Sequence, residues 1–194
     1  MKKNYTKMEK KEDIFRETSD LPGLLGAFEY VFRRFRFFSF MILSFSVFGL
    51  GIICIGLALV PSVYIVLSTY DWCQDFSLLP KSITMAFTLS ISYLSYGISV
   101  CFVAPTLNFI LPLKVQSWRG IWHSLQSIPW YIHNALTYIV RYTFLDLITP
   151  TPLNTLFYRM MGMKIGKGVV INSTNISDPC LITLGDYVTI GGSA

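Results

Sequence analysis

The sequence predicts an α-helical membrane region, with two transmembrane helices plus an interfacial helix, followed by the start of a parallel β-helix. Three observations predict this fold class. Two long runs carry no charged residue, residues 114 to 150 carry apolar side chains at helical spacing, and residues 165 to 194 repeat an aliphatic-Gly pattern. With 53% hydrophobic and only 14% charged residues, the chain is too apolar for a soluble domain of 194 residues.

Residues 1 to 36 are predicted to be a basic cytoplasmic segment. Nine of them are Lys or Arg, and Arg33, Arg34 and Arg36 directly precede the first apolar run. The linker at residues 69 to 81 holds two Asp and one Lys. The positive-inside rule therefore places the N-terminus and everything after Leu113 in the cytoplasm. The net charge of +5 is largely this topology signal, so no nucleic-acid partner is predicted.

Residues 37 to 113 are predicted to cross the lipid bilayer twice. Residues 37 to 68 and 82 to 113 are uncharged, and each run exceeds the roughly 20 residues that a transmembrane helix needs. Pro61 and Pro105 are expected to kink or terminate these helices. Small residues are expected to bring the two helices into close contact. They are Gly49, Gly51 and Gly56 in the first run, and Ser90, Ser92, Ser95, Gly97 and Ser99 in the second.

Residues 114 to 150 are predicted to form an amphipathic helix in the membrane interface, interrupted near Pro129. Apolar positions from Trp118 to Leu147 recur at helical spacing, while the polar residues fall largely on other faces. The alternative is a third span at residues 128 to 148. It would bury four polar or ionisable residues, which is costly, and would move the C-terminal region outside the cell. These residues are His133, Asn134, Arg141 and Asp146.

Residues 151 to 194 are predicted to begin a β-helix, because an aliphatic residue followed by Gly recurs with a period of six. Six residues make one flat side of a triangular coil, whose aliphatic side chains stack in a narrow interior. The clearest copies are Ile165-Gly166-Lys167-Gly168-Val169, Leu184-Gly185-Asp186-Tyr187-Val188 and Ile190-Gly191-Gly192-Ser193-Ala194, with Ile171-Asn172-Ser173-Thr174-Asn175 as a weaker one. Residues 176 to 181 break the phase, and Pro179 marks them as an irregular corner.

The segment leading into these repeats resembles the hexapeptide-repeat acyltransferase superfamily, which has a left-handed parallel β-helix. The resemblance rests on Thr151-Pro152 and on Tyr158-Arg159-Met160-Met161-Gly162-Met163-Lys164-Ile165-Gly166. It is strongest to the membrane-embedded C-terminal region of polylysine-synthetase-type non-ribosomal peptide synthetases. It implies transfer of an acetyl or other acyl group from CoA to a hydroxyl or amine, with acyl-CoA as co-substrate, no metal, and a homotrimer if the β-helix is completed.

The resemblance supplies no catalytic residue for this chain. Members of the family use a His in the repeat region as general base, but His123 and His133 both precede the first hexad. We interpret them as interfacial polar residues and assign no catalytic, CoA-binding or metal-binding residue. The four cysteines, Cys54, Cys73, Cys101 and Cys180, show no paired spacing that would indicate a disulfide framework or a thiolate metal site.

The length of the repeat region leads to two expectations about function. Thirty residues give fewer than two coils of about 18 residues, whereas repeat folds usually need three or more units. We therefore expect a fragment, a frameshifted remnant or the N-terminal part of a longer acyltransferase. The alternative is a non-catalytic membrane anchor or assembly protein. A small transporter subunit is a more distant alternative, because the predicted spans lack ionisable residues.

Overall fold

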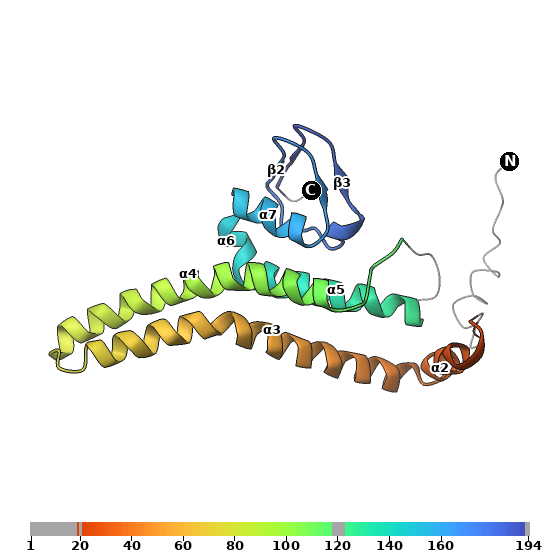
Figure 1. Ribbon diagram of the computed structural model, residues 1–194, viewed down its shortest axis with the longest axis horizontal. Coiled ribbons are helices and arrows are strands. Elements are labelled where there is room, and N and C mark those ends of the chain that lie inside the picture. Colours follow the sequence, from red (N-terminus) through yellow and green to blue (C-terminus); the bar gives the residue numbers. More distant parts are fainter. Residues whose placement is uncertain (1–18, 20, 118–122, 193–194) are drawn as a thin grey trace.

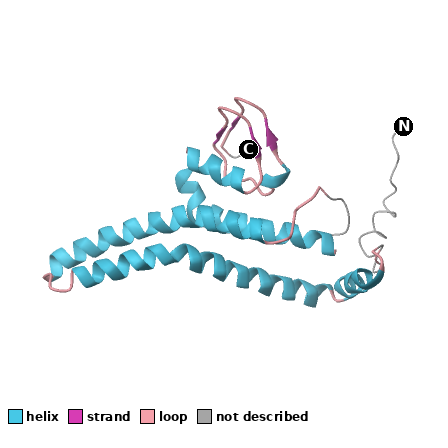
Figure 2. Cartoon of the chain, in the orientation of Figure 1, coloured by secondary structure: helices cyan, strands magenta, loops and turns pink. Residues whose placement is uncertain are grey.

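The computed structural model describes residues 19, 21–117 and 123–192, and most of them are helical (Figure 1; Figure 2). The α-helices are α2 (Gly23–Arg34), α3 (Arg36–Trp72), α4 (Leu78–Ile110), α5 (Ile128–Val140), α6 (Asp146–Ile148) and α7 (Pro152–Met160). Short 3₁₀ turns are η1 (Leu125–Ser127) and η3 (Pro179–Leu181), and η2 (Arg141–Leu145) is a π-helical turn. The strands are β1 (Lys164–Ile165), β2 (Val170–Ile171), β3 (Thr183–Leu184) and β4 (Thr189–Ile190).

Helices α3 and α4 form a long antiparallel hairpin (Figure 1). Both are long and apolar enough to cross a membrane, with mean hydropathies of 2.5 and 1.6 over their most apolar stretches. Only 17% and 33% of those stretches are buried inside the molecule, whereas a core helix of a soluble protein is mostly buried. The two predicted apolar helices are therefore confirmed, and most of their surface faces away from the protein.

The contact between α3 and α4 is made by small side chains, but only part of the predicted set takes part in it. Cys54 and Ala58 of α3 and Ala104 of α4 are completely buried in the common core. The prediction is wrong for Gly49 and Gly56, because a Cβ added at either would meet nothing within 4 Å. These two glycines face outward, and the helix face next to them makes the contact.

Within the hairpin, the prediction for Ser92 is confirmed, whereas the expectation for the two prolines is not. Ser92 lies in the α3–α4 contact as predicted: its hydroxyl donates to the Ser62 carbonyl (3.3 Å), and the Ser62 hydroxyl donates to the Ser92 carbonyl (2.7 Å). The expectation that Pro61 or Pro105 ends a helix is wrong, because α3 and α4 continue through them. Apolar spanning helices tolerate proline when neighbouring groups satisfy the freed backbone carbonyls.

Helix α5 packs lengthwise against the hairpin and runs antiparallel to α4 (Figure 1). Its first turns lie near the end of α4, where His133 contacts Asn108. Beyond the other end of α5, Tyr93 of α4 donates to the Thr143 carbonyl of η2 (2.8 Å). Pro129 lies in the first turn of α5, so it begins this helix and does not interrupt it. The predicted helical positions 118 to 122 lie outside the described residues.

The strands form two short parallel pairs beside α7. β1 pairs with β3, joining Lys164 to Thr183, and β2 pairs with β4, joining Val170 to Thr189. In both pairs the partners are 19 positions apart in the sequence. The strand region and the helices share one core, in which Ile171 packs with the completely buried Phe157 and Tyr158 of α7.

Candidate functional site

A series of side-chain hydrogen bonds joins α5, η2 and α6 to residues 173–178, which we call the docking segment. At one end, an Asp178 carboxylate oxygen accepts hydrogen bonds from the Trp130 indole N–H (2.6 Å) and the Asn134 amide (3.2 Å). Trp130 and Asn134 lie four residues apart on α5, so both side chains point from the same helix face. A single carboxylate thus holds two successive turns of α5.

The same helix face continues this contact toward α6. The Tyr138 hydroxyl lies 3.4 Å from the Ser177 hydroxyl, and the Arg141 guanidinium donates to the Asn175 side-chain oxygen. Beyond them, the Thr174 hydroxyl donates to the Asp146 carboxylate (2.6 Å). As the helix residue number rises, the docking-segment number falls. The segment therefore runs antiparallel to α5 in a register that side-chain hydrogen bonds specify.

His133 is buried between α4 and α5 and does not lie at a solvent interface. Its side chain is 1% exposed, and its Nδ1 lies 3.0 Å from the Asn108 side-chain oxygen. An amide oxygen can only accept, so this contact fits the tautomer in which Nδ1 carries the proton and Nε2 keeps its lone pair. Nε2 has no hydrogen-bond partner among the described residues. Burial lowers the His133 pKa, although the Asp178 charge partly opposes this, so the ring is a neutral base enclosed by helices.

His123 lies in a different environment, in the chain that precedes η1. It is half-buried, and both its burial and the nearby positive charge of Arg36 lower its pKa. The interpretation of a polar surface residue therefore suits His123 better than His133. The two histidines occupy separate places and do not form one site.

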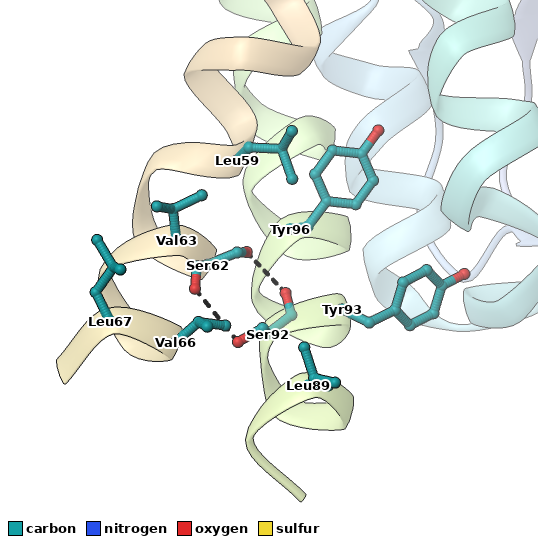
Figure 3. A pocket seen from close by; sticks show the side chains of 9 residues that line it. All are labelled: Leu59, Ser62, Val63, Val66, Leu67, Leu89, Ser92, Tyr93 and Tyr96. Carbon is teal, nitrogen blue, oxygen red and sulfur yellow. Dashed lines mark hydrogen bonds between the residues drawn. The ribbon is translucent and has the colours of Figure 1, made fainter. Parts of the chain in front are cut away.

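An apolar pocket of about 370 Å³ opens between α3 and α4, away from α5 (Figure 3). Its walls are Leu59, Ser62, Val63, Val66, Leu67, Leu89, Ser92, Tyr93 and Tyr96. The hydroxyls of Ser62 and Ser92 are engaged in the reciprocal hydrogen bonds between the helices, drawn as dashed lines. The described lining of this pocket is therefore mostly hydrocarbon and includes no charged side chain.

A second hollow, of about 330 Å³, lies between α7 and the first two strands. Its lining mixes threonine hydroxyls, glycine backbone and the Arg159 side chain, which also donates to the Ile165 carbonyl (3.3 Å). Its lining residues are Pro150, Thr151, Pro152, Thr155, Leu156, Arg159, Gly166, Gly168, Val169, Val170 and Ile171. This hollow is the more polar of the two and could admit a polar or anionic group.

Metal and thiol chemistry find little support in the described part of the chain. No group of three His, Cys, Asp or Glu side chains there is arranged to hold a metal ion. The four cysteines are free thiols. Burial, and then the neighbouring Asp178 charge, raise the Cys180 pKa, so its thiol stays protonated and is a poor nucleophile.

The contact between α5 and the docking segment was not predicted from the sequence, although the sequence contains a pattern that points to it. Residues 176 to 181 were expected only to break the hexad phase. The signal was the spacing of Trp130, Asn134, Tyr138 and Arg141, which places hydrogen-bonding groups along one helix face.

No family model matches the chain, and neither the curated proteins nor the solved structures gave a significant match.

Proposed function

We propose that this chain is the membrane-anchoring N-terminal part of a hexapeptide-repeat acyltransferase. Such an enzyme transfers an acetyl or other acyl group from CoA to a hydroxyl or amine acceptor, and its general base would lie in later repeats. The observation that carries the proposal is the common 19-residue offset of the two parallel strand pairs. In a β-helix, each strand of one coil pairs with the strand one coil later, so all such pairs are separated by the same number of residues.

The register of these pairs supports stacked coils. Ile165 pairs with Leu184 and Ile171 with Ile190, so aliphatic residues of the predicted hexads lie directly beside one another. β1 and β2 start six residues apart, as do β3 and β4. A coil of three six-residue sides would give an offset of 18. The one additional residue falls in the interval that contains η3, which explains why the hexad phase breaks near Pro179.

The backbone at corresponding positions supports the same interpretation. Gly168 and Tyr187 both have positive φ angles, of 63° and 56°, and they are separated by the same offset as the strands. The Tyr187 N–H donates to the Lys167 carbonyl (2.7 Å), while the Asp186 carboxylate accepts from the Lys167 N–H (2.7 Å). A Cβ at Gly168 would lie 2.7 Å from the Tyr187 ring, so the two turns stack closely.

The surface of the hairpin supports a membrane location. Phe45, Phe48 and Phe87 are each about two-thirds exposed, an arrangement that water disfavours and hydrocarbon accepts. Helices of 37 and 33 residues rise about 55 and 50 Å, which exceeds a hydrocarbon core of about 30 Å, so we expect them to tilt. In Figure 1, α2 lies at the end of the hairpin, and the strands lie beside its length, next to α5. We assign the end with α2 to the cytoplasm from the basic residues that precede α3.

The test reads the transcript beyond the codon for Ala194 and assays the native membrane product for release of free CoA from acetyl-CoA. We expect the frame to continue into further hexads that include a His, and acceptor-dependent release of CoA thiol. A stop codon directly after Ala194, together with no CoA release, would overturn the enzymatic proposal and leave the non-catalytic anchor as the function.

A further inference from the structure

The pattern of exposure on α2 is the reverse of that on a helix of a soluble protein. Leu24, Phe28, Val31 and Phe35 recur every three or four residues along one face, and their exposed fractions are 81%, 67%, 51% and 55%. On the opposite face, Glu29 and Arg33 are 3% and 8% exposed and form a salt bridge of 3.0 Å. The Ser19 hydroxyl also donates to Glu29. The charged face is covered by the chain, and the apolar face is not.

The uncovered face of α2 is continuous with the apolar surface of the hairpin. Phe35 separates α2 from α3, and its φ and ψ of −105° and 51° bend the chain at that point. Beyond the bend, Phe37, Phe38 and Ile42 are 71%, 66% and 68% exposed. The exposed apolar surface of α3 therefore begins directly after Phe35, and the polar residues between Phe35 and Ile42 are Arg36 and Ser39, both half-buried.

The charges on α2 identify the depth at which it would lie. Arg33 and Arg34 are in its last turn, and Arg36 follows after Phe35. Arg34 projects from the flank of the apolar face, about 80° from Leu24 on a helix that turns about 100° per residue. Arginine at such a flank keeps its stem along hydrocarbon and its guanidinium at the level of lipid phosphates. Acidic residues are absent from the first turn, and Glu29 is neutralised by Arg33.

We propose that α2 lies in the plane of the phospholipid interface, with Leu24, Phe28, Val31 and Phe35 among the upper acyl chains. The inference rests on the proposed membrane location of α3 and adds a second, non-spanning attachment at its cytoplasmic end. It places residues 23–34 at the lipid interface, within what the sequence predicted only as a basic cytoplasmic segment. The helix would fix the rotation and tilt of α3 by holding Phe35 at the interface.

The test uses the full chain in vesicles of phosphatidylcholine and phosphatidylglycerol whose acyl chains carry an alkyne tag. A photoreactive benzoylphenylalanine replaces one aromatic residue at a time: Phe28 in α2, Phe45 in α3, or Tyr187 in the strand region. The three native side chains are 67%, 66% and 81% exposed, so access to the probe is comparable. After irradiation, the fraction of protein that carries tagged lipid is measured.

We expect lipid adducts from positions 28 and 45 at similar yields, and at most a tenth of that yield from position 187. Adducts at 45 without adducts at 28 would overturn the placement of α2 and leave the membrane location of α3 intact. Adducts at neither position would overturn both. Protein-to-protein adducts at 28 in place of lipid adducts would show that a second copy covers this face, which also overturns the inference.

Discussion

The α3–α4 hairpin and the contact between α5 and the docking segment are held together by different kinds of interaction. The hairpin buries small side chains such as Cys54 and Ala58 and leaves large apolar ones outside. The docking segment is joined to α5 by directional hydrogen bonds to Trp130, Asn134 and Tyr138. The difference indicates that the hairpin depends on its surroundings for stability. In the docking contact, by contrast, the side-chain hydrogen bonds themselves determine which residues pair.

The largest expected effect comes from removing the carboxylate at the end of the docking segment. Asp178→Ala would leave the Trp130 and Asn134 donors without their acceptor in a partly buried contact, which costs about 3 kcal/mol of unfolding free energy. Hydrogen exchange of residues 173–178, followed by mass spectrometry in detergent micelles, should show faster exchange there and unchanged exchange in α3. Asp178→Asn retains one acceptor oxygen and should lose less.

The matched control for this variant is Asp75→Ala, in the exposed turn between α3 and α4. Its carboxylate has no comparable buried donors, so the unfolding free energy should change by less than about 0.5 kcal/mol. Equal effects of the two substitutions would contradict the difference between the two regions. Such a result would mean that Asp178 contributes to stability only through its charge and not through its hydrogen bonds.

The second prediction concerns the point at which the two regions meet. A Cβ at Gly97 of α4 would lie 2.0 Å from the ring of Phe144, which is 3% exposed. Gly97→Ala should therefore force the π-helical turn away from α4 and cost about 2 kcal/mol. Gly56→Ala, where a Cβ meets nothing within 4 Å, should be neutral or slightly stabilising. Chemical unfolding of both variants in the same detergent provides the measurement.

A combined variant distinguishes overpacking from other causes. Replacing Phe144 by Ala removes the ring that the new methyl group would meet. In that background, Gly97→Ala should cost far less than in the native chain. Additive losses in a double-mutant cycle would refute a direct clash between these two residues.

How much could be predicted from the sequence depended on the range of the interaction. The two apolar helices and the strand positions at Ile165, Ile171, Leu184 and Ile190 follow from local patterns of length and period. The choice of Ala58 over Gly56 for the helix contact did not, because it depends on how α3 is rotated toward α4. Burial of His133 and pairing of Asp178 with α5 likewise depend on long-range packing.

The third prediction tests whether the hairpin contact is weakly directional. Ser62→Ala and Ser92→Ala each remove one of the two reciprocal hydroxyl-to-carbonyl hydrogen bonds. Hydrogen bonds between helices in membrane proteins contribute about 0.6 kcal/mol on average, so each variant should lose that much. Because each hydroxyl bonds to a backbone carbonyl of the other serine, the two losses should be nearly additive. A loss as large as that of Asp178→Ala would remove the contrast between the regions.

The smallest effect at neutral pH, and the one that depends on conditions, concerns His133. Burial holds its folded-state pKa below the ordinary value of 6.5, so unfolded chains bind more protons in the interval between the two values. Its contribution to stability is therefore complete above pH 6.5 and is lost as the pH falls toward and through the lowered pKa. Unfolding free energies of the native chain and of His133→Gln, measured across this pH interval, should differ in slope, with the value for the native chain falling more steeply as the pH is lowered.

Because His123 is present in both proteins, its titration cancels in the comparison. Parallel slopes would mean that protonated His133 is accommodated between α4 and α5, with the negative charge of Asp178 offsetting the cost of burial.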